Sequence, residues 1–132
     1  MTSDSHWTVS AFERLPELVD KDPNLLRRGR YLTIEFMVEI GSVPFYLSIA
    51  NGRLVAFERG PKIMRPWAFA VRGGEEAWNH FWQPMPEPGY HDIFALIKRQ
   101  GARVEGDIRA FMAHLQYFKD LLAAPRRLSK EH

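Results

Sequence analysis

The first half of the chain alternates apolar and other residues in a pattern that predicts strands. Over residues 31–40, apolar side chains occupy every second position, which is typical of a strand with one buried face. The same alternation returns over residues 45–50 and continues over residues 53–58. Asn51-Gly52 separates the last two stretches, and this pair favours a hairpin because a type I′ turn needs positive φ at both central positions. The pattern predicts three strands in an antiparallel meander.

A fourth strand is predicted over Trp67–Arg72, after a crossover loop at Gly60–Pro66. Its alternation places Trp67, Phe69 and Val71 on one face and the small residues Ala68 and Ala70 on the other. No charged residue interrupts this segment before its last position. We therefore expect the strand to lie inside the sheet rather than at its edge.

The N-terminal segment has apolar residues at helical spacing. Residues 8–28 are expected to form a helix that starts at a capping box of Ser10 and Glu13. Pro16 is expected to kink or restart this helix, and Asp22-Pro23 to form a turn.

The second half of the chain favours helices, with one short strand among them. Aromatic and aliphatic residues recur there at intervals of three and four, which is the spacing of one helix face. The last helix is expected to carry one apolar face, made of Ile108, Phe111, Met112, Leu115, Phe118 and Leu122. The predicted elements are a helix from Glu75, a helix over residues 89–100 with Gly101 as its C-cap, a strand over 102–105, and a helix from the N-cap Asp107 to Pro125.

Length and composition fit a folded domain with a substantial core. The chain has 132 residues, of which 45% are hydrophobic, and it includes nine Phe, four Trp and four Tyr. We expect one domain over residues 1–124 and a basic, frayed tail over residues 125–132. The absence of cysteine excludes disulfides, thiolate metal sites and a cysteine nucleophile.

Charge and hydropathy narrow the classes of partner. The formal net charge is +2, and the tail alone accounts for it, whereas a nucleic-acid binder concentrates positive charge on one face. We therefore expect no nucleic-acid partner. No stretch approaches the roughly 20 apolar residues of a membrane-spanning helix, so no integral membrane segment is expected. No signal peptide is recognised at the N-terminus, and a cytoplasmic location is predicted.

Catalytic patterns are sparse. The five histidines have no metal-ligand spacing, and no Gly-x-Ser-x-Gly elbow is present. His91 and Asp92 are adjacent at the predicted start of a helix, where neighbouring side chains diverge by about 100°. Glu35 and Glu39 share a strand face about 13 Å apart, too far for a paired acid and base. The sequence predicts no catalytic residue, no metal site and no cofactor.

Three motifs carry a family resemblance. They are the hairpin Ile49–Leu54, the strand Trp67–Val71 leading into Glu75-Glu76-Ala77-Trp78, and the segment Lys98–Asp107 with its glycine, strand, glycine and acid. In this order the chain resembles the sterol carrier protein 2 (SCP2) family over roughly residues 30–124. The resemblance implies an α+β fold, in which helices cover a five-stranded, mostly antiparallel sheet and an apolar tunnel lies between the layers. It also implies binding of sterols, fatty acids, acyl-CoA or other lipids without chemistry, or a role as an accessory module of a larger enzyme.

The aromatic residues are the candidate ligand site. One interpretation is a packed core, and the other is the lining of an apolar cavity, in which methionine adapts to varied ligands. The residues expected to contact a ligand are Phe57, Trp67, Phe69, Trp78, Phe81, Trp82, Phe94, Ile97, Phe111, Met112 and Leu115.

The function expected first is non-enzymatic binding or carriage of an apolar small molecule, driven by burial of its surface. The alternative is a small enzyme or accessory enzyme subunit acting on a hydrophobic substrate, with His91 and Asp92 at a pocket mouth. A scaffold without a ligand is a third interpretation. The sequence is compatible with an enzyme partner or with a homodimer.

Overall fold

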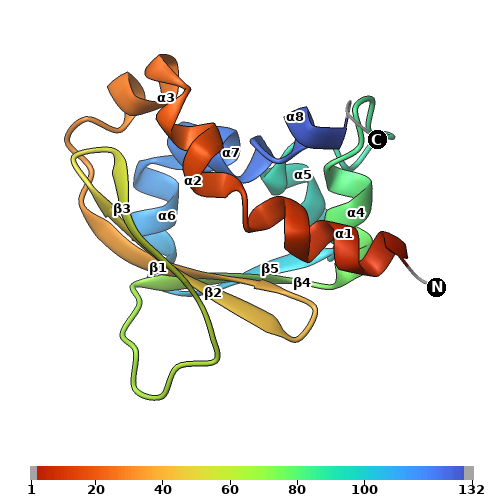
Figure 1. Ribbon diagram of the computed structural model, residues 1–132, viewed down its shortest axis with the longest axis horizontal. Helices are drawn as coiled ribbons and strands as arrows, with labels where there is room; N and C mark the ends of the chain where they lie inside the picture. The colour runs from red at the N-terminus through yellow and green to blue at the C-terminus, as the bar shows by residue number, and fades with distance from the viewer. Residues whose placement is uncertain (1–2, 130–132) are drawn as a thin grey trace.

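A mixed sheet forms one layer of the structure, and helices cover one of its faces (Figure 1). The computed structural model describes the backbone from residue 3 to residue 129 and the side chains from residue 7 to residue 128. In this part of the chain five strands lie in the order β3-β2-β1-β4-β5. Their bounds are β1 Ile34–Ile40, β2 Val43–Ala50, β3 Arg53–Arg59, β4 Phe69–Gly73 and β5 Ala102–Gly106.

The pairing of the strands confirms the predicted meander. β1 pairs antiparallel with β2, and β2 with β3, through a turn at which Asn51 and Gly52 have φ of 52° and 82°. β4 runs parallel to β1 and antiparallel to β5, so it lies inside the sheet as expected. The register places Phe36 beside Leu47 and Phe69, which builds a continuous apolar face toward the helices.

The helices are short, and their ends differ from several sequence expectations. Their bounds are α1 Ser3–Phe12, α2 Leu15–Asp20, α3 Pro23–Arg28, α4 Glu75–Phe81, α5 Ile93–Lys98, α6 Ile108–Ala113, α7 Leu115–Ala123 and α8 Arg126–Ser129. The prediction of a capping box at Ser10 and Glu13 is wrong, because α1 begins at Ser3 and Ser10 lies inside that helix. Pro16 does restart the helix, in the first turn of α2, where its missing N–H is tolerated.

The helix predicted over residues 89–100 is shorter in the structure. The helix expected from residue 89 begins at Ile93, because the Asp92 carboxylate accepts the Ala95 N–H at 2.8 Å and caps it. At its end, Gln100 takes the left-handed conformation with φ 67°, and Gly101 donates its N–H to the Leu96 carbonyl at 2.9 Å. This is the hydrogen-bond pattern of a Schellman motif, so Gly101 lies one position beyond the left-handed residue.

The last predicted helix is divided at His114, whose φ of −127° and ψ of 39° separate α6 from α7. The burial of the expected apolar face is also uneven. Phe111 and Phe118 are buried as expected, whereas Ile108 and Met112 are 51% and 45% exposed. The prediction of one continuous helix with a single apolar face is therefore wrong.

The tail also differs from its expectation up to Ser129. Residues 126–129 form α8, with Leu128 buried against the core. The Arg126 guanidinium donates to the Phe81 carbonyl at 2.6 and 3.0 Å, which holds this segment against α4. Residues 130–132, also expected to fray, lie outside the described residues. No helix in the described chain is both long and apolar enough to cross a membrane.

Candidate functional site

The eleven residues expected to contact a ligand lie in different environments. Five are fully buried between sheet and helices: Phe69, Trp78, Phe81, Trp82 and Phe111. Three more, Phe57, Ile97 and Leu115, are half-buried against the same core, whereas Phe94 and Met112 are exposed on the helix layer. Trp67 is the exception, because it lies against the opposite face of the sheet. The structure therefore brings together eight of the eleven.

Trp67 corrects a prediction about strand faces. β4 begins only at Phe69, so the alternation that assigned Trp67 and Phe69 to one face does not extend back to Trp67. Its indole packs with Met37, Tyr46 and Ala70 on the helix-free face. Trp67 therefore does not line a site between the sheet and the helices.

Four phenylalanine rings meet beneath α6. Phe69 lies 5.3 Å from Phe111, 4.9 Å from Phe118 and 5.1 Å from Phe36, measured between ring centroids. The rings come from β1, β4, α6 and α7 and are each no more than 1% exposed. We call these four residues the phenylalanine cluster. Sequence reasoning placed Phe36 and Phe118 on buried faces but did not name them as site residues.

A second aromatic group lies between α1, α4 and the sheet. Trp82 stacks on Phe12 with 5.9 Å between centroids and lies 5.1 Å from Trp78. The Trp82 indole N–H donates to the Leu122 carbonyl at 2.7 Å, and the Trp78 indole N–H donates to the Glu39 carbonyl at 3.0 Å. Since both buried indoles are hydrogen-bonded, this group is fixed in place.

The helix above the phenylalanine cluster is weakly anchored. Within α6 Phe111 alone is buried, although the helix is capped by Asp107, whose carboxylate accepts the Ala110 N–H at 3.1 Å. A six-residue helix with one buried side chain belongs to the low-stability end of a fold, where local opening occurs first. The non-helical backbone of His114 separates α6 from α7.

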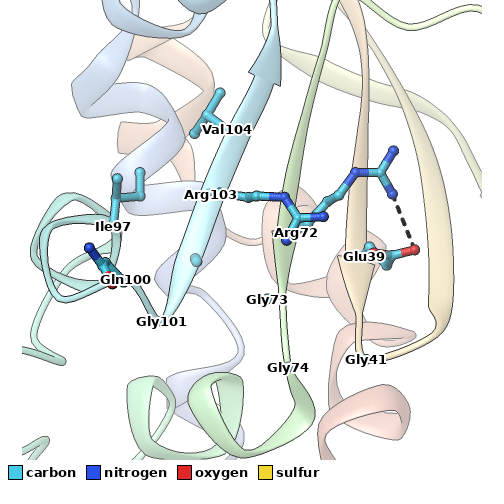
Figure 2. A pocket seen from close by; sticks show the side chains of 11 residues that line it. Glu39, Gly41, Arg72, Gly73, Gly74, Ile97, Gln100, Gly101, Arg103 and Val104 are labelled. Carbon is cyan, nitrogen blue, oxygen red and sulfur yellow. Dashed lines mark ion pairs between the residues drawn. The ribbon is translucent and has the colours of Figure 1, made fainter.

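A depression of about 670 Å³ lies at the end of β4 and β5 (Figure 2). Arg72 lies between two carboxylates there, 3.2 Å from Glu39 and 2.8 Å from Glu105, and Arg103 lies 2.7 Å from Glu105. Hydrogen bonds from Arg103 and Arg72 hold the pKa of the Glu105 carboxyl below its usual range. The charged groups neutralise one another, so this depression presents neither a free base nor a net anion site.

Asp92, named with His91 as a candidate at a pocket mouth, has a structural role. Burial raises the pKa of the Asp92 carboxyl, but the Ala95 N–H and the charges of Lys119 and His91 outweigh burial, so its pKa lies below the usual value. The carboxylate caps α5 and lies 3.6 Å from the Lys119 ammonium. Within the described chain, no group of three or more His, Asp or Glu residues is placed to hold a metal ion.

A further depression of about 670 Å³ lies beside the proline-rich loop after α4, lined by residues that include His80 and Met85. The two His80 ring nitrogens lie 3.8 and 3.9 Å from carboxylate oxygens of Glu76 and Glu87. The ring also stacks near Tyr90, with 4.9 Å between centroids. These contacts connect the loop to α4 and give His80 a structural role.

No family model matches the sequence. No curated protein matches it significantly either. The fold does match solved structures. The conserved hypothetical protein TT1886 from Thermus thermophilus, described as possibly a sterol carrier protein, superposes with a TM-score of 0.69 at 10% identity, over 94% of this chain and 87% of that one. A crystal structure of sterol carrier protein 2 gives a TM-score of 0.69 at 11% identity, over 92% and 94% of the two chains.

A third solved structure is named UbiJ-SCP2, a ubiquinone synthesis protein. It matches with a TM-score of 0.57 at 18% identity, over 89% of this chain and 94% of that chain. All three matches extend over most of both chains, and the element order and mixed sheet agree with the resemblance seen in the sequence motifs. The chain therefore has the SCP2-like α+β fold.

Proposed function

We propose that this protein binds an apolar molecule of lipid size beneath α6, against the phenylalanine cluster, without catalysing a reaction. The observation that carries the proposal is the combination of four buried rings and a covering helix held by the single buried side chain of Phe111. The SCP2-like fold, shared with a sterol carrier protein, supports it. The ion-paired Glu39, Arg72 and Glu105 do not support an enzymatic alternative at the end of the sheet.

Binding in this position requires α6 to swing outward and Phe111 to leave the cluster. The aliphatic chain of the ligand then takes the place of the Phe111 ring against Phe69 and Phe118. A ligand that buries about 300 Å² of apolar surface gains roughly 7 kcal/mol before the costs of association and of displacing the ring. The exposed Met112 and Ile108 side chains lie on the moving helix and supply apolar surface at its rim.

Long-chain fatty acids are therefore expected to stabilise the folded protein. At a free concentration about one hundred times the dissociation constant, the gain is roughly 2.7 kcal/mol, or on the order of 10 °C in melting temperature for a chain of this length. Melting curves recorded with a series of fatty acids of increasing chain length measure this effect. Hexanoate is the matched control, since it buries too little surface to displace the ring. An absence of any shift with the longest chains would contradict the proposal.

A second candidate is an accessory subunit of an enzyme that acts on an apolar substrate. It is favoured by the close packing of the chain's own rings between the layers, where Trp82 contacts both Phe12 and Trp78. The neighbour named as a ubiquinone synthesis protein is consistent with it. Under this alternative the melting temperature does not respond to fatty acids, and the protein acts through its surface.

A further inference from the structure

The loop that joins β3 to β4 exposes two large apolar side chains at its tip. Ile63 and Met64 are 95% and 93% exposed, the highest values for large apolar residues in the described part of the chain. They are adjacent, and Figure 1 shows their loop (yellow-green) projecting from the sheet on the side away from the helices. Neither side chain contributes to the core, so the fold itself gives no reason for apolar residues here.

The base of this loop is held in a defined shape. The Tyr46 hydroxyl lies 3.4 Å from the Lys62 carbonyl oxygen and 3.5 Å from the Lys62 nitrogen, and the Gly60 N–H donates to the Pro44 carbonyl at 2.8 Å. On the return side, Trp67 packs on the helix-free face of the sheet. Because both ends of the loop are anchored to the sheet, its backbone loses less conformational freedom on binding than a free loop would.

The charge of the loop complements an anionic surface. Residues 59–67 contain three basic residues and no acidic one. Arg59 pairs with Glu13 at 3.1 Å and Arg65 pairs with Glu58, whereas Lys62, next to the apolar tip, pairs with no carboxylate of the described chain. A protruding cation is thus available beside Ile63 and Met64.

We propose that the β3–β4 loop docks this protein on a membrane surface that contains anionic lipid. In this docked position the side chains of Ile63 and Met64 at the tip of the loop insert into the acyl region of the bilayer, and the Lys62 ammonium contacts lipid phosphates. Tyr46 and Trp67 at the base of the loop lie at the depth of the lipid headgroups. Basic residues near an anionic leaflet each strengthen binding about five-fold. Each inserted apolar side chain contributes about tenfold.

This docking mode does not depend on an apolar ligand being bound. The loop and α6 lie on opposite faces of the sheet (Figure 1), so a docked protein keeps its helix layer toward the aqueous side. In that orientation α6 stays free to open. Failure of the ligand proposal and failure of the docking proposal are therefore separate outcomes of separate measurements.

Flotation with vesicles tests the docking proposal. We expect the protein to float with vesicles of phosphatidylcholine and phosphatidylserine, to float much less with phosphatidylcholine alone, and to release as salt is raised. The double variant Ile63→Ser/Met64→Ser is expected to bind about a hundredfold more weakly, and Lys62→Glu about five-fold more weakly or worse. All three side chains are exposed, so the variants are expected to melt like the wild type.

Matched controls use the same substitutions elsewhere on the surface. Met85→Ser changes a methionine that is 89% exposed in the proline-rich loop, and Lys98→Glu makes the same charge reversal in the last turn of α5. Both are expected to bind vesicles like the wild type. Failure of the wild type to float with anionic vesicles, or flotation that the loop variants leave unchanged, overturns the proposal. Binding of a protein partner through Ile63 and Met64 without vesicle binding overturns it as well.

Discussion

Replacing Phe111 by alanine is expected to lower the free energy of unfolding by about 3–5 kcal/mol and, at the same time, to strengthen binding of a long-chain fatty acid. The first effect follows from the cavity that remains beside Phe69 and Phe118 when a fully buried ring is removed. The second follows because the ligand no longer has to displace that ring, and we expect the dissociation constant to fall about tenfold or more. Urea unfolding and calorimetric titration measure the two effects separately.

Phe12→Ala is the matched control for this experiment. Phe12 is also fully buried, but its ring packs on Phe45 and Trp82, away from the phenylalanine cluster. We expect a similar loss of stability and a dissociation constant equal to that of the wild type. Equal changes in affinity for the two variants would show that the protein responds to any core cavity, and the proposed position beneath α6 would be wrong.

The second large effect concerns Trp82, whose replacement by alanine is expected to destabilise the protein by about 4–5 kcal/mol. The indole is fully buried between Phe12 and Trp78, and its N–H satisfies the Leu122 carbonyl. Trp82→Phe keeps an aromatic ring and loses the hydrogen bond, so about 1–3 kcal/mol is expected. Denaturant unfolding of the two variants compares loss of the whole side chain with loss of the hydrogen bond and of part of the indole.

Trp67→Ala provides the comparison for this second prediction. Trp67 is half-buried on the helix-free face, so its loss is expected to cost under about 2 kcal/mol and to leave fatty acid affinity unchanged. A larger effect on stability than that of Trp82→Ala would contradict the placement of the two indoles. A lost ligand response in Trp67→Ala would contradict the assignment of the ligand to the helix-covered face.

The strands were predictable because their signal is local. Period-two alternation over residues 31–40 and 45–50 corresponds to one face of β1 and β2 buried under helices, and Asn51-Gly52 determines the register of the next strand. The interior position of β4 also followed from its own residues, since it carries no charge before Arg72. Strands of this kind can be predicted without knowing which elements pack against them.

The predictions that were wrong concern segments whose conformation depends on tertiary contacts. Trp67 continues the alternation of β4 in sequence, yet the chain there still belongs to the crossover loop, so its side chain turns to the other face. His114 carries no helix-breaking signal, so the division between α6 and α7 could not be predicted from the residues around it. The docking of α8 depends on the Phe81 carbonyl, which lies 45 residues before Arg126 in the chain.

The sequence predicted which types of residue make up the candidate site, but not where in the fold the site lies. Aromatic residues at helical and strand spacing indicated that Phe69, Trp82 and Phe111 belong either to a packed core or to a cavity lining, and the structure buries all three. Sequence spacing could not distinguish Phe111, which anchors α6, from Met112, which lies on its outer surface. That distinction depends on how α6 sits on β4, and it determines which residue a ligand has to displace.

The most direct test of the ligand proposal is photo-cross-linking with a long-chain fatty acid that carries a diazirine near the end of its chain, followed by mapping of the modified peptides by mass spectrometry. We expect modification of peptides that contain Phe69, Phe111 or Phe118, and loss of that modification with excess unlabelled fatty acid. Modification confined to surface segments such as the β3–β4 loop, or unaffected by competitor, would show that no apolar ligand binds beneath α6.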